Sequence, residues 1–230
     1  MAPETAPSAV ERGRAPLSRE LILDTGAEFI EEHGLRRLTM RRLGQELRVE
    51  AMALYRYVPS REDLLDGVVE RILMELQEDP DVFVDPRQGW QDYLVRLAHG
   101  LRKLAVAYPQ VFPILATRPT GAPWIRPPLR SLAWIESFLA ALTSSGFSDR
   151  DAADAYQSFS SFLLGNLLLH VSLEGEGTQP ESAAQESHGV DLGGYPNIHR
   201  MQTLLAESWN EQEFDMALQD VLNRIELLNS

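Results

Sequence analysis

Apolar residues recur at intervals of three and four along most of the chain, and no segment alternates strictly between apolar and polar positions. This pattern predicts an all-α protein. The first helix is expected to follow Ser18, which can cap it, and to end at Gly34. Two short helices are expected next, over residues 39–47 and 50–58. Pro59 stops the second because proline cannot continue the helical hydrogen-bond ladder.

Longer helices are expected in the rest of the chain. Ser60 with Asp63, and Ser148 with Asp151, can each form a capping box at a helix start. The expected helices cover residues 60–77, 90–108, 129–145, 148–173, 197–207 and 211 to near the C-terminus. The second half of the helix at 148–173 is apolar nearly all round, so other helices must cover it on every side.

The last helix has a regular apolar stripe. Its members step by four and three, the spacing typical of a contact between two helices: Phe214, Leu218, Val221, Ile225 and Leu228. Together with the apolar run at 162–173, the stripe leads us to expect a two-fold symmetric dimer through these two helices.

Two segments have the opposite composition. Residues 1–17 are rich in Ala, Pro, Glu and Arg without periodicity, and residues 174–196 are dense in Gly, Ser and Glu. Such segments have too little apolar surface to offset the entropy lost on ordering. We expect a disordered arm over 1–17 and a flexible loop over 174–196.

Charge is distributed unevenly. The 230 residues include 21 Lys and Arg against 34 Asp and Glu, a net charge of −13, which argues against nonspecific coating of nucleic acid. The stretch from Arg36 to Arg61, however, contains seven arginines and two glutamates, a local net charge of +5. This one basic segment suits contact with phosphates.

Several kinds of site lack the residues that they need. The chain has no cysteine, which excludes disulfides, thiolate zinc sites and cysteine nucleophiles. A glycine-rich phosphate loop, a nucleophile elbow and a nucleotide fingerprint are also absent from the sequence, so we expect no enzyme activity, no cofactor and no metal. The N-terminus has no apolar stretch of signal-peptide length, and the run at 162–173 is too short for a bilayer. We therefore expect a cytoplasmic protein without a membrane partner.

The two short helices lie inside the basic segment, and such a pair joined by a tight turn is typical of a helix-turn-helix. The helix at 50–58 would enter the major groove, where the small Ala51 and Ala53 allow approach to base edges or a thymine methyl. Arg41 would contact a guanine and Arg61 a phosphate. The alternative is that the arginines form a solvated face and the tyrosines belong to the core. The expected DNA contacts are Thr39, Met40, Arg41, Ala51, Met52, Ala53, Tyr55, Arg56, Tyr57 and Arg61.

Residues 38–69 read LTMRRLGQELRVEAMALYRYVPSREDLLDGVV. This stretch resembles the DNA-binding domain of the tetracycline repressor (TetR) family of bacterial regulators. The matching features are the capping Thr39, the Leu-x-Val turn at 47–49, the Leu-Tyr-x-x-Val pattern beginning at Leu54, and a Leu-Leu pair at 64–65. Arg48 stands where the family usually has glycine, and a left-handed arginine costs about 1 kcal/mol or more.

The resemblance extends into the rest of the chain. Three stretches are similar to the ligand-binding domain of the tetracycline-responsive branch: GWQDYL at 89–94, ATRPT at 116–120 and SGFSDRDAADAY at 145–156. The resemblance implies a three-helix helix-turn-helix DNA-binding domain over 18–65 and a larger helical ligand-binding and dimerisation domain over 66–230. It also implies that the helix at 148–173 and the last helix form a four-helix bundle with a second subunit. The helices between 60 and 173 would line an inducer pocket.

The polar pocket groups of the magnesium-tetracycline-binding members are replaced in this chain. Gln77 and Ile114 stand where those members have histidines, Leu97 where they have an asparagine, and Leu169 where they have a glutamate. Magnesium requires hard oxygen ligands that Leu169 cannot supply. The loop arginine and proline persist as Arg118 and Pro119, so the pocket is expected to remain while its ligand changes to a mainly apolar molecule bound without magnesium.

Other residues could line this pocket. Asn166 and His170 lie four apart on one helix face and either line the pocket or pair in the core or at the dimer seam. The aromatic candidates, including Phe112 and Trp134, are either pocket walls or plain core. The candidate ligand-binding residues are Leu97, Leu101, Phe112, Ile114, Arg118, Pro119, Trp134, Phe162, Asn166 and His170.

The sequence thus predicts a homodimeric, ligand-responsive transcriptional regulator. It would act as a repressor that a small apolar molecule releases from a pseudo-palindromic operator in double-stranded DNA. The alternative is a helical small-molecule-binding protein without a DNA-binding role. The basic segment argues against the alternative, because nothing else in an acidic protein requires seven arginines in 26 residues.

Overall fold

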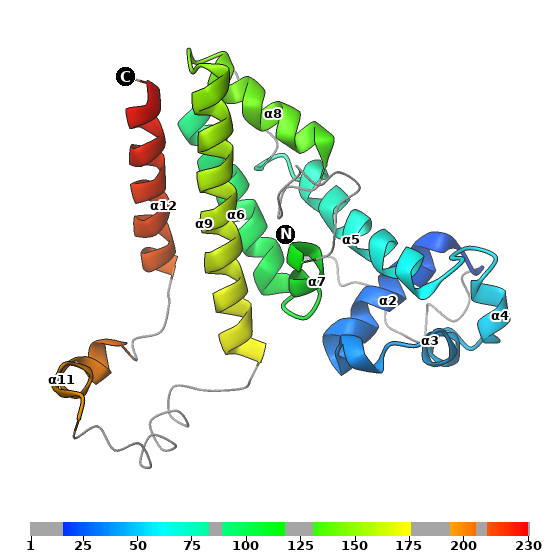
Figure 1. The fold of residues 1–230 in the computed structure, drawn as a ribbon. Coiled ribbons are helices and arrows are strands. Elements are labelled where there is room, and N and C mark those ends of the chain that lie inside the picture. The colour runs from blue at the N-terminus through cyan, green and yellow to red at the C-terminus, as the bar shows by residue number, and fades with distance from the viewer. Residues whose placement is uncertain (1–15, 83–88, 118–130, 176–193, 206–210, 230) are drawn as a thin grey trace, which may run out of the picture. The chain divides into compact units, whose positions relative to one another are not determined.

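The computed structural model describes residues 16–82, 89–117, 131–175, 194–205 and 211–229. Within these ranges the regular elements are helices and no strand occurs, which confirms the expected fold class (Figure 1). Most of the expected arm and of the expected loop at 174–196 lies outside the described residues.

The chain divides into two compact units, Met1–Glu78 (unit 1) and Asp79–Ser230 (unit 2). The domain boundary expected after residue 65 falls inside helix α5 (Arg61–Glu78), all of which belongs to unit 1. This helix stays with unit 1 because it packs along α2 (Arg19–His33). The two helices approach so closely that a Cβ atom on Gly67 would lie 2.7 Å from Leu23 Cδ2.

Unit 1 contains α2, the short 3-10 helix η1 (Leu35–Arg37), α3 (Met40–Glu46), α4 (Ala51–Leu54) and α5. The expected helix starts are confirmed, because three side chains accept a backbone N–H at these positions: Ser18 from Leu21 at 3.1 Å, Thr39 from Arg42 at 3.2 Å and Ser60 from Asp63 at 3.0 Å. Helices α2, α3 and α5 therefore begin where local side-chain chemistry predicts.

Helix α4 is shorter than the expected helix over 50–58. It ends at Leu54, and the N–H groups of Tyr57 and Val58 both donate to the Leu54 carbonyl at 2.9 Å in the turns that follow. Pro59 sets the furthest possible end, because a residue that precedes proline disfavours the helical conformation. The chain therefore leaves the helix before Val58.

Unit 2 contains α6 (Trp90–Ala107), α7 (Phe112–Thr117), α8 (Leu132–Thr143), α9 (Asp149–Gly175), α11 (Pro196–Leu205), α12 (Glu211–Glu226) and the 3-10 helix η4 (Leu227–Asn229). Helix α9 packs against α6, α7, α8 and α12, as expected for a helix with an apolar surface on several sides (Figure 1). Among the described helices, none has the length and apolar character needed to cross a membrane.

The apolar stripe of α12 is buried within the chain itself. Phe214, Leu218 and Ile225 are covered where α12 packs on α9 and α6. Val221 and Leu228 are half-buried. The stripe is a contact between two helices, as its spacing predicts, and its central side chains are already covered within the chain. The expected dimer through these two helices stays a prediction, and only the half-buried members of the stripe are left to face a second subunit.

Candidate functional site

The turn between α3 and α4 depends on two backbone features. Arg48 adopts a left-handed conformation with φ 55° and is the one non-glycine residue with positive φ among the described residues. A Cβ atom on Gly44 would lie 2.8 Å from the Val49 carbonyl oxygen, so only glycine allows α3 to approach the turn this closely. Gly44 is not among the residues predicted from the sequence, although a glycine inside so short a helix is itself a signal of close backbone approach.

The outer face of the two short helices is exposed over a buried base. Leu43 of α3 and Leu54 of α4 are fully buried and hold both helices on unit 1. The side chains that remain exposed on or next to these helices include Thr39, Arg41, Met52, Tyr55, Arg56 and Tyr57, whereas Ala51 and Ala53 are half-buried. The tyrosines are therefore not core residues. We call the exposed residues on and next to these two helices, which are of mixed apolar and basic character, the α3–α4 face.

Met40 does not belong to this face. It is only 7% exposed and forms part of the core beneath α3. As the first residue of α3 it directs its side chain inward, so its burial does not support the prediction of a DNA contact.

Arg61 is engaged within the protein. Its Nε donates to the Leu38 carbonyl at 3.2 Å and its Nη2 to the Leu35 carbonyl at 3.3 Å. Its Nη1 also lies 3.6 Å from a Glu62 carboxylate oxygen. Arg61 therefore ties the start of α5 to the chain that leads into α3, and this geometry suits a positioning residue better than a phosphate contact.

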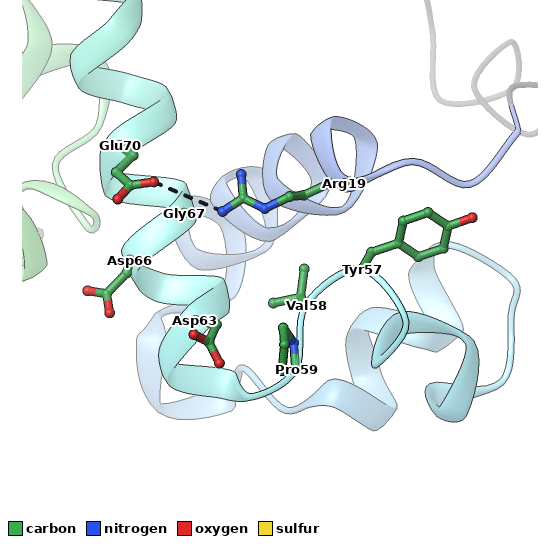
Figure 2. A pocket seen from close by; sticks show the side chains of 8 residues that line it. All are labelled: Arg19, Tyr57, Val58, Pro59, Asp63, Asp66, Gly67 and Glu70. Carbon is green, nitrogen blue, oxygen red and sulfur yellow. Dashed lines mark ion pairs between the residues drawn. The ribbon is translucent and has the colours of Figure 1, made fainter.

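An acidic cleft of about 280 Å³ lies between the start of α2 and the first turns of α5. Figure 2 shows Asp63, Asp66 and Glu70 along α5, with Arg19 of α2 reaching toward Glu70, 4.0 Å away. The three carboxylates of the cleft repel phosphates. Tyr57, one of the exposed tyrosines next to α4, also lines this cleft. The cleft therefore adjoins the α3–α4 face but adds no basic surface to it.

Half of the ten expected ligand-binding residues are buried in unit 2. The buried members are Leu97 and Leu101 of α6, Phe112 and Ile114 of α7, and Trp134 of α8. Asn166 and His170 are half-buried on α9, while Arg118 and Pro119 lie outside the described residues. Five apolar candidates from three helices are thus buried in unit 2.

Phe162 lies elsewhere. It lines a groove of about 450 Å³ on the surface of α9 and α12, together with Val221 and Arg224. Its ring centroid is 5.8 Å from that of Phe214. Its position on an open groove between two helices suits an interface better than an internal pocket.

Tyr93 of α6 is a buried polar residue that is not among the residues predicted from the sequence. Only 1% of it is exposed, and burial raises the pKa of its hydroxyl to about 12. Tyr93 therefore stays neutral at ordinary pH, and no sequence signal distinguishes it from the other tyrosines.

Two family models match the chain. Residues 22–68 match "Bacterial regulatory proteins, tetR family", and residues 84–228 match "Tetracyclin repressor-like, C-terminal domain". The chain belongs to the TetR family. It is therefore a ligand-responsive DNA-binding transcriptional regulator, with a helix-turn-helix in unit 1 and a helical ligand-binding domain in unit 2.

Individual relatives of the chain support the assignment. The chain is 27% identical over 171 residues to an HTH-type transcriptional regulator of Saccharopolyspora erythraea, covering 71% of this chain and 68% of the relative. It is 31% identical over 157 residues to the tetracycline repressor protein class D of Escherichia coli, covering 67% of this chain and 66% of that repressor. The chain thus spans about two thirds of the length of these relatives, which are transcriptional regulators rather than enzymes.

A solved structure is similar to this chain over most of its length. It is that of a possible TetR family transcriptional regulator from Streptomyces coelicolor A3(2), with a TM-score of 0.74 and 26% identity, covering 92% of this chain and 100% of that chain.

The magnesium site of the tetracycline-binding TetR members has no counterpart among the described residues. Among the described residues, no group of three or more His, Cys, Asp or Glu side chains could hold a metal ion. Ile114 is buried and Leu169 is exposed, and both offer only hydrocarbon where a metal would need oxygen or nitrogen. These residues do not fit magnesium.

Proposed function

We propose that this regulator is a repressor that binds a pseudo-palindromic operator as a homodimer and leaves it when a small, mainly apolar molecule binds to unit 2. The α3–α4 face is the observation that supports operator binding most directly. Its exposed basic and aromatic side chains stand over buried Leu43 and Leu54, so the two helices can enter the major groove as one rigid surface.

The residues of this face suit different contacts. Arg41 can donate two hydrogen bonds to a guanine, and Arg56 can neutralise a phosphate. Thr39 and the two tyrosines can donate to backbone oxygens or pack on base edges, and the half-buried Ala51 and Ala53 leave room for the approach. We assign operator contact to these residues and to Met52.

We infer that the dimer forms through the groove of α9 and α12. Phe162 and Val221 line it, and both are apolar side chains that are only half-buried within the chain. Ser161 and Gly165, both exposed on α9, are small enough to allow a second helix to approach closely. Packing this groove on its two-fold copy would form a four-helix bundle.

The ligand would bind among apolar side chains of unit 2. The buried candidates on α6, α7 and α8 favour an apolar molecule, because affinity then comes from burial at about 25 cal/mol per Å². The ligand must bind more tightly to the form that does not bind DNA, since otherwise no release follows. We further infer that the protein acts in the cytoplasm and has no enzymatic activity.

Selection from a random duplex library with the purified full-length protein tests the proposal. We expect enrichment of a two-fold symmetric sequence whose half-sites lie about one helical turn or slightly more apart. Apolar drug-like compounds that raise the melting temperature should then release this duplex in a shift assay. Failure to enrich any duplex, with the protein still folded and binding such compounds, would support the alternative of a ligand-binding protein without a DNA-binding role.

A further inference from the structure

Helix α4 lacks side chains that could read the hydrogen-bond pattern of a base pair. Its four residues are Ala51, Met52, Ala53 and Leu54, and none carries a side-chain hydrogen-bond donor. Leu54 is fully buried and serves as the anchor of the helix. Base recognition by α4 itself must therefore rest on apolar contact.

Met52 is the side chain that α4 presents outward. It is 75% exposed, compared with 42% for Tyr55 and 40% for Tyr57. Tyr55 lies three residues later and keeps a helical conformation (φ −64°, ψ −13°), so it falls on the same side as Met52. Met52 is thus an exposed apolar side chain on a face that also carries the exposed Arg41 and Arg56. Such a face suits a polyanionic partner that offers an apolar group.

The C5-methyl group of thymine is the apolar group that the major groove displays on base edges. We propose that Met52 is a specificity-determining residue that contacts this methyl group, so that the operator half-site requires a thymine opposite α4. This inference rests on the proposed binding of an operator through the α3–α4 face. The unbranched thioether of Met52 can adapt its rotamers to the methyl without a hydrogen-bond partner.

Replacement of thymine by deoxyuridine tests the contact, because it removes only the methyl group. Starting from the duplex enriched with the full-length protein, each thymine of the half-site is replaced symmetrically in both halves. Burial of one methyl is equivalent to about 0.8 kcal/mol, so we expect an approximately fourfold loss of affinity per contacted methyl at one position or two adjacent positions.

Three variants separate Met52 from its surroundings. Met52→Gln keeps the length of the side chain but makes its end polar, so the difference between thymine and deoxyuridine should disappear. Met52→Leu remains apolar and should keep most of that difference. Met74→Gln is the matched control, because Met74 of α5 is also exposed (49%) but lies outside the α3–α4 face, and it should behave as the unmodified protein.

The outcomes separate this inference from the proposed function. An enriched duplex with no methyl-sensitive thymine, or equal methyl sensitivity in Met52→Gln and the unmodified protein, would overturn the inference and leave operator binding intact. If no duplex were enriched at all, the proposed function would fail and the inference with it.

Discussion

The guanidinium of Arg61 at the start of α5 donates from Nε to the backbone carbonyl of Leu38, 3.2 Å away and 23 residues earlier in the chain. A second bond reaches Leu35 at 3.3 Å. Both acceptors lie just before Thr39, which caps α3. Arg61 thus holds the entry to the helix-turn-helix on the helix that ends unit 1.

Arg61→Ala should therefore weaken the fold of unit 1 without altering the salt dependence of DNA binding. Loss of the two bonds should lower the free energy of unfolding by about 1 kcal/mol, measured by thermal or urea unfolding. The slope of log affinity against log salt should stay the same, because Arg61 releases no counterion. Arg56→Ala is the control, since loss of a phosphate contact reduces this slope by about 1. A similar reduction in Arg61→Ala would assign Arg61 to a phosphate instead.

Arg48→Gly should stabilise the protein. Arg48 has φ 55°, a conformation that costs about 1 kcal/mol or more for a residue with a Cβ atom and little for glycine. The free energy of unfolding of unit 1 should rise by about 1 kcal/mol. Arg48→Ala removes the same charge but keeps the Cβ atom, so it should give no such gain. Equal stabilisation by both variants would point to charge rather than backbone strain.

Charge substitutions on α12 should separate folding from dimerisation. Leu218→Glu places a carboxylate in the core between α12 and its neighbours and should reduce helicity and melting temperature, at a cost of more than about 3 kcal/mol. Val221→Glu places the same charge in the α9–α12 groove and should shift the mass toward one chain in sedimentation equilibrium while helicity is kept. Gln219→Glu, at an exposed position outside this groove, is the control and should stay dimeric. A dimeric Val221→Glu protein would rule out the groove as the interface.

Tyr93 should make unit 2 sensitive to alkaline pH. Burial raises its pKa in the folded protein to about 12, whereas an exposed tyrosine titrates near 10. Above pH 10 the unfolded chain gives up this proton more readily than the folded one, so stability is lost as pH rises. The loss between pH 9 and pH 11 should be about 1 kcal/mol larger in the unmodified protein than in Tyr93→Phe, measured by urea unfolding. A parallel loss in both proteins would contradict the assignment.

Magnesium should have no effect on the ligand response. Ile114 and Leu169 supply hydrocarbon at the positions where tetracycline-responsive members use metal-binding groups. Calorimetry with tetracycline should therefore detect no binding that depends on magnesium. Any compound that releases operator DNA should do so equally with and without a chelator. Tight tetracycline binding that a chelator abolishes would show that other groups hold the metal.

The sequence alone determined the helix starts, the turn at Arg48 and the position of the helix-turn-helix. Each of these depends on interactions within about four residues: Ser18, Thr39 and Ser60 accept bonds from the third residue ahead, and Pro59 limits the residue before it. Such interactions depend only on residues close together in the sequence, so they can be predicted without knowledge of distant contacts.

Only the tertiary structure decided which partners the remaining side chains have. The apolar stripe of α12 has the same spacing whether it meets α9 of its own chain or a second subunit, and the fold directs Leu218 and Ile225 to the former. From the sequence alone Arg61 resembles a phosphate contact, because the sequence does not show that the carbonyls of Leu35 and Leu38 lie within hydrogen-bond distance. Met40 and Met52 differ in role only because Met40 faces the core and Met52 does not. Burial and long-range hydrogen bonds depend on how helices pack, and residue spacing does not encode that packing.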